Sequence, residues 1–133
     1  MNSDLTKQLV DKFPKLYSKN FHFSVGDGWY GILYDLSAKL SEYIDNADEE
    51  LLEQMRETGI DFDQTCLVGQ CKEKFGSLRY YLNCGMPKEV NDIVDVVEDI
   101  AGTICEVCGK EGKMRNGGWI KCLCDEHDEN RKK

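Results

Sequence analysis

The chain has 133 residues, with 17 Lys and Arg against 25 Asp and Glu, a formal net charge of −8 and seven cysteines. This length suits one domain of about 100–150 residues with room for a small appended module. With 41% hydrophobic and 32% charged residues, the chain can build a core and is not disordered by composition. The negative charge disfavours general binding to duplex nucleic acid, because such binding depends on displacing counterions with Lys and Arg.

The sequence indicates a cytoplasmic protein that carries a metal. Its apolar runs are too short to span a bilayer, and the start at Met1 lacks the basic segment and apolar run of a secretory signal. Thiols stay reduced in the cytoplasm. An odd number of cysteines therefore predicts metal binding rather than a disulfide framework.

The N-terminal half predicts three helices. A short first helix is capped by Ser3 and ended by Pro14. A loop with an extended stretch follows and ends in a Gly-Asp-Gly turn, where Asp27 is placed to cap a longer helix. The acidic run at 48–50 favours the start of a third helix. The apolar residues of the long second helix recur every three or four positions, which predicts one buried stripe: Trp29, Ile32, Leu33, Leu36, Leu40, Tyr43 and Ile44.

The middle of the chain predicts a β-hairpin followed by a long helix. From Cys66 the hydrophobic period changes from about four residues to two. We interpret residues 66–83 as a hairpin with its tight turn at Gly76 and with Phe75 on its apolar face. An isolated hairpin is marginal in water, so this face must lie on the helices. Pro87 suits the first turn of the next helix. Together these elements predict an α+β domain over residues 1–104.

The last segment has the ligand spacing of a zinc finger. Cys105 and Cys108 form a Cys-x2-Cys pair followed by glycine, and Cys124 and His127 form a Cys-x2-His pair. Two such pairs supply the four ligands of a tetrahedral zinc site. With a Gly-Gly turn and a strand between them, they predict a treble-clef-like zinc finger over 105–133, packed against the first domain. Four protein ligands leave no open position, so one structural zinc ion is expected.

The spacing alone does not decide which of two cysteines, Cys122 or Cys124, is the third thiolate ligand. Cys122 lies two residues before Cys124 and competes with it. We prefer Cys124 because it pairs with His127 at helical spacing. The remaining cysteines have no partner at ligand spacing and are interpreted as ordinary core or surface residues: Cys66, Cys71 and Cys84.

Three segments resemble a family of small proteins encoded by tailed phages and prophages, whose members usually have no assigned function. They are the Lys-Glu-Lys-Phe-Gly-Ser-Leu-Arg run at 72–79, the Gly-Asp-Gly-Trp turn at 26–29 and the zinc-finger segment with its Gly-Gly-Trp-Ile-Lys run. The resemblance covers most of the chain. Where the family has threonine before the last ligand pair, this chain has Cys122, which favours Cys124 as the ligand. The resemblance implies an accessory role for a phage, including inhibition of a host defence system.

Two functions are predicted. The first is a non-enzymatic interaction protein that binds a host or phage protein. The small size of the chain, its acidity and its closed metal site favour this function. The alternative is nucleic-acid binding, with basic groups around an aromatic ring suited to base stacking. A solvated hairpin face, with lysines protecting a strand edge, is the simpler interpretation of the same side chains. The candidate binding residues are Lys72, Lys74, Arg79 and Tyr81, extended by Lys113, Arg115 and Lys121.

An enzyme is the least favoured class. The chain has two histidines, His22 and His127, and the second is a predicted metal ligand. A Gly-x-Ser-x-Gly elbow and a phosphate-binding Gly-Lys-Ser/Thr loop are both missing from the sequence. We therefore predict no catalytic residues.

Overall fold

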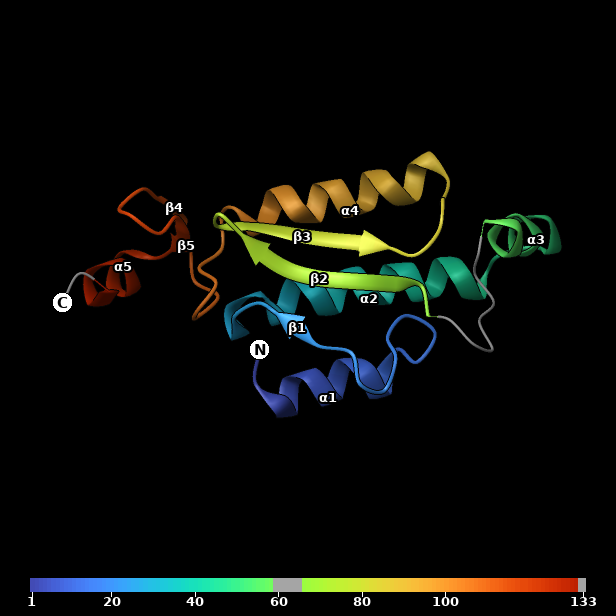
Figure 1. Cartoon of the computed structure of the whole chain (residues 1–133), viewed down its shortest axis with the longest axis horizontal. Helices are drawn as coiled ribbons and strands as arrows, with labels where there is room; N and C mark the ends of the chain where they lie inside the picture. The colour runs from blue at the N-terminus through green and yellow to red at the C-terminus, as the bar shows by residue number, and fades with distance from the viewer. Residues whose placement is uncertain (59–65, 132–133) are drawn as a thin grey trace.

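The computed structural model describes residues 1–58 and 66–131 and confirms an α+β fold with a zinc-finger-like C-terminal region (Figure 1). None of the described helices is long and apolar enough to cross a bilayer. The elements are α1 Ser3–Lys12, β1 Phe23–Ser24, the 3₁₀ turn η1 Asp27–Trp29, α2 Tyr30–Asp45, α3 Glu49–Glu57, β2 Val68–Lys74, β3 Ser77–Leu82, α4 Lys88–Ala101, β4 Lys113–Arg115, β5 Lys121–Leu123 and α5 Asp125–Arg131.

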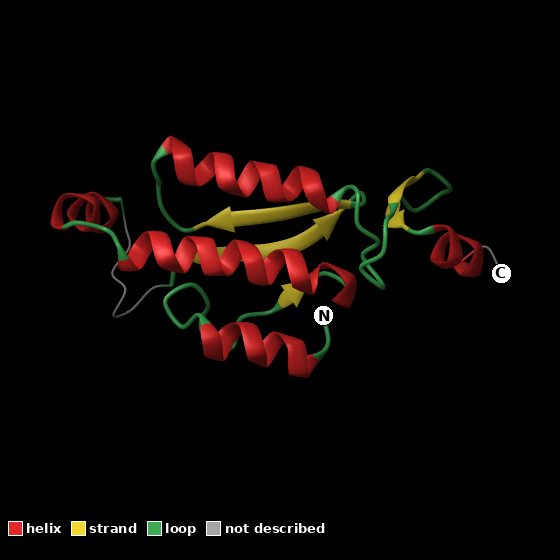
Figure 2. Ribbon diagram, turned by 180° about the vertical axis from the view of Figure 1, so that it is seen from behind, coloured by secondary structure: helices red, strands yellow, loops and turns green. Residues whose placement is uncertain are grey.

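A three-stranded sheet in the order β1-β2-β3 has helices on one side. β1 runs parallel to β2, and β2 runs antiparallel to β3. Helices α2 and α4 lie behind the strands in Figure 1 and in front of them in Figure 2. Because side chains alternate along a strand, the inward residues meet the helices and their neighbours point to the other side. That other side, here named the open face, has no helix over it within the described chain and carries Gln70, Lys72, Lys74, Ser77, Arg79 and Tyr81.

Buried hydroxyl groups join the sheet to the helices. The Tyr17 hydroxyl lies 2.6 Å from Ser37 Oγ and 2.8 Å from the Tyr80 hydroxyl. Ser37 also donates to the Leu33 carbonyl at 2.6 Å. Burial raises the pKa of both tyrosines, so both remain neutral donors. The network ties α2, β3 and the segment after α1 together in the otherwise apolar core.

The structure differs from the sequence prediction at two helix starts. Asn2, not Ser3, caps α1, and its side chain accepts a hydrogen bond from the Leu5 backbone N–H. The carboxylate of Asp27 is occupied by Asn2, whose backbone N–H and side-chain amide both donate to it. Asp27 therefore heads η1 and does not cap α2.

The hairpin turn also differs from the prediction. Phe75 and Gly76 form a two-residue turn in which both have positive φ, 53° and 80°. This is the backbone of a type I′ turn. Phe75 is thereby removed from the apolar face, where we expected it, and is 64% exposed.

The hydroxyl network gives a stability prediction. Replacing Tyr17 by Phe removes the hydroxyl that joins Ser37 to Tyr80 and leaves both buried groups one hydrogen bond short, which should lower the free energy of unfolding by about 1–3 kcal/mol. Tyr81→Phe is the matched control, because Tyr81 is 47% exposed on the open face. It should change stability by less than about 0.5 kcal/mol. Urea titration of both variants measures the difference, and equal effects would contradict a structural role for the network.

Candidate metal centre

Four side chains converge at the start of the C-terminal region. The ligand atoms of Cys105, Cys108, Cys124 and His127 all lie within 4.8 Å of one another. Cys108 Sγ is 3.7 Å from Cys124 Sγ, and Cys124 Sγ is 3.2 Å from His127 Nδ1. Thiolates at about 2.3 Å from a tetrahedral ion are separated by about 3.8 Å. The arrangement therefore provides one metal site, built by the loop after α4, the end of β5 and the first turn of α5.

Cys122, the competing ligand, lies outside the cluster. It is fully buried among residues of the main core. Its Sγ lies 3.5, 3.3 and 3.2 Å from the carbonyl oxygens of Ala101, Gly102 and Ile104. The Cys122 thiol thus lies against backbone carbonyls at the end of α4 and in the residues just after it. The structure resolves the choice between the two cysteines in favour of Cys124.

The geometry of the site favours the thiolate form at Cys124. The backbone N–H of His127 hydrogen-bonds its sulfur and lowers the pKa of the thiol to about 6, with the His127 side chain acting in the same direction. A pKa below neutrality leaves most of this cysteine deprotonated at pH 7. The thiolate is the form that binds metals.

The Cys105–Cys108 loop rests directly on the Gly-Asp-Gly-Trp turn. The Gly28 backbone N–H donates to the Glu106 carbonyl at 2.7 Å, and Gly26 N–H donates to Glu106 Oε2 at 2.8 Å. Trp29, fully buried, donates from Nε1 to the Ile104 carbonyl at 2.9 Å. A Cβ at Gly28 would lie 2.1 Å from the Cys105 carbonyl oxygen. Only glycine permits this approach of two backbones.

A second contact joins the hairpin turn to β4 and β5. Lys121 Nζ lies 3.1 Å from Glu73 Oε1 and 3.8 Å from Glu106 Oε1. Glu73 also accepts the Gly76 backbone N–H at 2.7 Å. A Cβ at Gly76 would lie 2.6 Å from Met114 Cε, so the hairpin turn packs directly against β4. Residues 105–131, here named the metal region, are therefore held to the rest of the fold at two places, the Gly-Asp-Gly-Trp turn and the hairpin turn.

The predicted macromolecule-binding residues do not form one surface. Lys72, Lys74, Arg79 and Tyr81 share the open face. Lys121 is held in the ion pairs just described. Met114 faces the hairpin, so its neighbours Lys113 and Arg115 lie on the opposite side of β4. Arg115 is bound there, 2.7 Å from Asp125 and 3.5 Å from Asp128.

Sequence reasoning missed the role of the Gly-Asp-Gly-Trp turn. Its glycines and tryptophan were visible, but the pattern was interpreted as a helix cap beside a core residue. Nothing in the sequence of the turn indicates that it contacts the Cys105–Cys108 loop, 80 residues further along the chain. Two exposed aromatic residues, Phe75 and Trp119, are 64% and 73% exposed and are not among the seven predicted macromolecule-binding residues.

No family model, no curated protein and no solved structure matches the chain. The site is therefore interpreted from its own geometry, and the phage-family resemblance remains an expectation.

The backbone contact gives a prediction at Gly28. Gly28→Ala places a methyl group against the Cys105 carbonyl and should cost about 1–3 kcal/mol in the free energy of unfolding. Gly31→Ala is the control, because a Cβ there meets nothing within 4 Å. In helix α2 that substitution should be neutral or stabilise by up to about 1 kcal/mol. Thermal unfolding compares the two; an unaffected Gly28→Ala variant would show that the loop does not press on the turn.

Proposed function

We propose that the chain is a non-enzymatic, zinc-stabilised cytoplasmic protein of phage origin, which binds a host or phage protein through its open face. The phage origin, and with it inhibition of a host defence system, is supported by the sequence resemblance. The zinc and the binding face are supported by the geometry described above.

Zinc suits the donor set of the cluster. Three thiolates and one imidazole are the soft and borderline ligands that structural zinc takes, and four protein ligands close the coordination shell. The ion then has no position for substrate or water. A site of this kind contributes about 10–16 kcal/mol to folding in zinc-finger peptides.

The zinc proposal predicts different metal contents for two neighbouring cysteines. The purified chain should carry one zinc per molecule by elemental analysis. Cys124→Ser should lose most of it, whereas Cys122→Ser should keep it, because Cys122 faces the core carbonyls. Full zinc in Cys124→Ser, or another metal at one equivalent in the unsubstituted chain, would contradict the assignment.

The observation that carries the binding proposal is the composition of the open face. Lys72 and Lys74 form no ion pair with an acidic group among the described residues, and Arg79 has only a longer-range electrostatic interaction, with Glu98. Arg79 Nε is buried without a hydrogen-bond partner there. Tyr81 adds a half-exposed ring. A cationic, aromatic face on a chain of net charge −8 complements an acidic partner.

Single-stranded nucleic acid is the second candidate, favoured by the same face. Cations beside Tyr81 could follow a backbone while the ring stacks on a base. The overall negative charge opposes it, since a polyanion extends beyond the face.

Affinity capture tests the binding face. A C-terminally tagged chain should retain a specific protein from host or infected-cell lysate, and Arg79→Ser/Tyr81→Ser should reduce its recovery at least about tenfold, as expected for central contact residues. Glu49→Gln/Glu50→Gln on α3, which lies outside the sheet at the end of the molecule opposite β4, β5 and α5 in Figure 1, should leave recovery unchanged.

Two results would count against the protein-binding proposal. One is equal recovery by the Arg79/Tyr81 variant, or no specific protein at all. The other is tight binding of a dT20 oligonucleotide that weakens steeply with salt and is lost in the same variant, which would favour the nucleic-acid candidate.

A further inference from the structure

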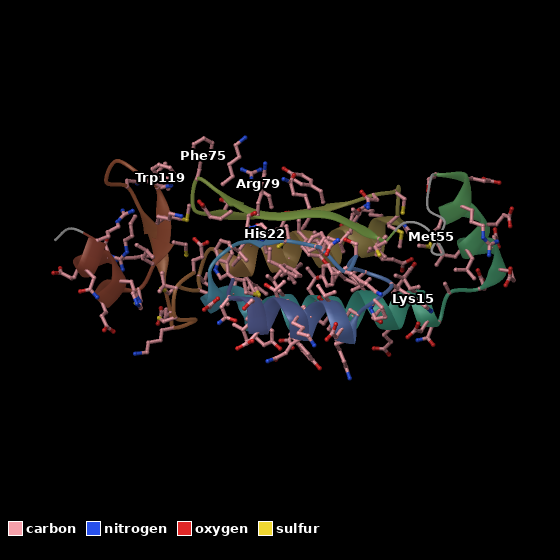
Figure 3. The ribbon with its side chains drawn as sticks, turned by 60° about the horizontal axis from the view of Figure 1, so that its bottom comes forward. Lys15, His22, Met55, Phe75, Arg79 and Trp119 are labelled. Atoms are coloured by element: carbon pink, nitrogen blue, oxygen red, sulfur yellow. The ribbon has the colours of Figure 1, made fainter. Side chains whose placement is uncertain are left out.

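Two exposed aromatic side chains flank a groove where the hairpin turn meets the metal region. Phe75 is 64% exposed and Trp119 is 73% exposed, and both lie on the same side of the molecule as Arg79 (Figure 3). The groove between them has a volume of about 460 Å³ and is lined by Glu73, Lys74, Phe75, Gly118, Trp119 and Ile120. Clustered apolar groups exposed in this way mark interaction sites.

Neither the turn nor the core accounts for phenylalanine at position 75. Its φ of 53° lies in the left-handed region, where Gly, Asn and Asp are favoured and a bulky residue is strained. Trp119 follows Gly118, which also has positive φ, 82°. Strained residues outside the core cluster at binding sites. The two turns thus hold large rings in solvent, where they contribute nothing to the packed interior.

The border of the groove is positively charged. Lys74 Nζ lies 5.7 Å from the centre of the Phe75 ring. Lys72 and Arg79 continue from it along the open face as a cross-strand pair. Glu73, the acidic lining residue, is neutralised by Lys121 at 3.1 Å. A ligand that fits must therefore combine an apolar group with negative charge beside it.

We propose that this groove binds an acidic peptide segment of a partner protein. One large apolar or aromatic side chain lies between Phe75 and Trp119, and neighbouring Asp or Glu residues pair with Lys72, Lys74 and Arg79. The proposal rests on the proposed function and names the chemistry of its partner. Aromatic and arginine side chains dominate the energetics of protein interfaces of this kind.

A short acidic segment fits the charge distribution better than a nucleic acid does. Helix α4 exposes Asp92, Asp95 and Asp99, which add to the net charge of −8, and this charge opposes a long phosphate chain more than a short peptide. A peptide places its few charges only over the cations. Addition of a strand to the β3 edge is blocked at Tyr80, whose backbone N–H already donates to Glu98 Oε2 at 2.9 Å. Recognition therefore depends on side chains.

Selection from a random 12-residue peptide library on the zinc-loaded full chain tests the proposal. The selected peptides should share one large apolar residue with at least two Asp or Glu within three positions. A synthetic peptide of that sequence, followed by fluorescence anisotropy, should bind at least about tenfold more weakly to Phe75→Gly, Trp119→Ala and Lys72→Glu/Lys74→Glu.

Two variants, Phe75→Gly and a control at Val96, separate binding from folding. Phe75→Gly relieves the left-handed strain, so this variant keeps its fold. Val96→Ala removes another exposed apolar side chain, on α4, and should change the affinity less than about twofold.

Other results would overturn the groove assignment. These are selected peptides without the apolar residue or without acids, dT20 binding lost in Trp119→Ala, or a dimer by light scattering that Trp119→Ala dissociates. The last result would mean that a second copy covers the groove. A captured protein that depends on Arg79 and Tyr81 but not on Phe75 and Trp119 overturns this inference while leaving the proposed function intact.

Discussion

The close backbone contact between the Gly-Asp-Gly-Trp turn and the Cys105–Cys108 loop organises the molecule. It has two requirements, a missing Cβ at Gly28 and the carbonyl and carboxylate of Glu106 as acceptors. Trp29 extends the contact into the core, where it is fully buried. A metal ion bound by the cluster therefore stabilises more than the last 30 residues, because fixing the loop also fixes the surface on which α2 begins.

The residues that carry the sequence resemblance meet at this junction although they are far apart in the chain. Gly28 receives the metal-binding loop, Glu73 and Gly76 hold the hairpin turn, and Lys121 links the turn to Glu106. Their shared task is to build the junction. The aromatic residues of the same segments, Phe75 and Trp119, take no part in it and remain in solvent, so a structural requirement does not account for them.

What the sequence predicted well depends on neighbouring residues, and what it predicted poorly depends on distant ones. The ligand spacing and the hydrophobic periods gave the α+β class and the cluster of Cys105, Cys108, Cys124 and His127, because each is set within a few turns of chain. The outward position of Phe75 could not be read from alternation, since the turn backbone overrides it. The partners of Lys121 come from segments 15 and 48 residues away, and no local pattern indicates them.

The positions of the charged side chains bear more directly on function than the net charge of the chain does. Among the seven candidate binding residues, Arg115 and Lys121 are held by carboxylates within the described structure. Lys72 and Lys74 are not, Arg79 interacts only at longer range with Glu98, and the three lie together on the open face. A cation already paired with a carboxylate on the protein surface attracts an anionic ligand only weakly. The field that a partner meets is therefore set by three cations beside two aromatic rings, and it is opposite in sign to the net charge of −8.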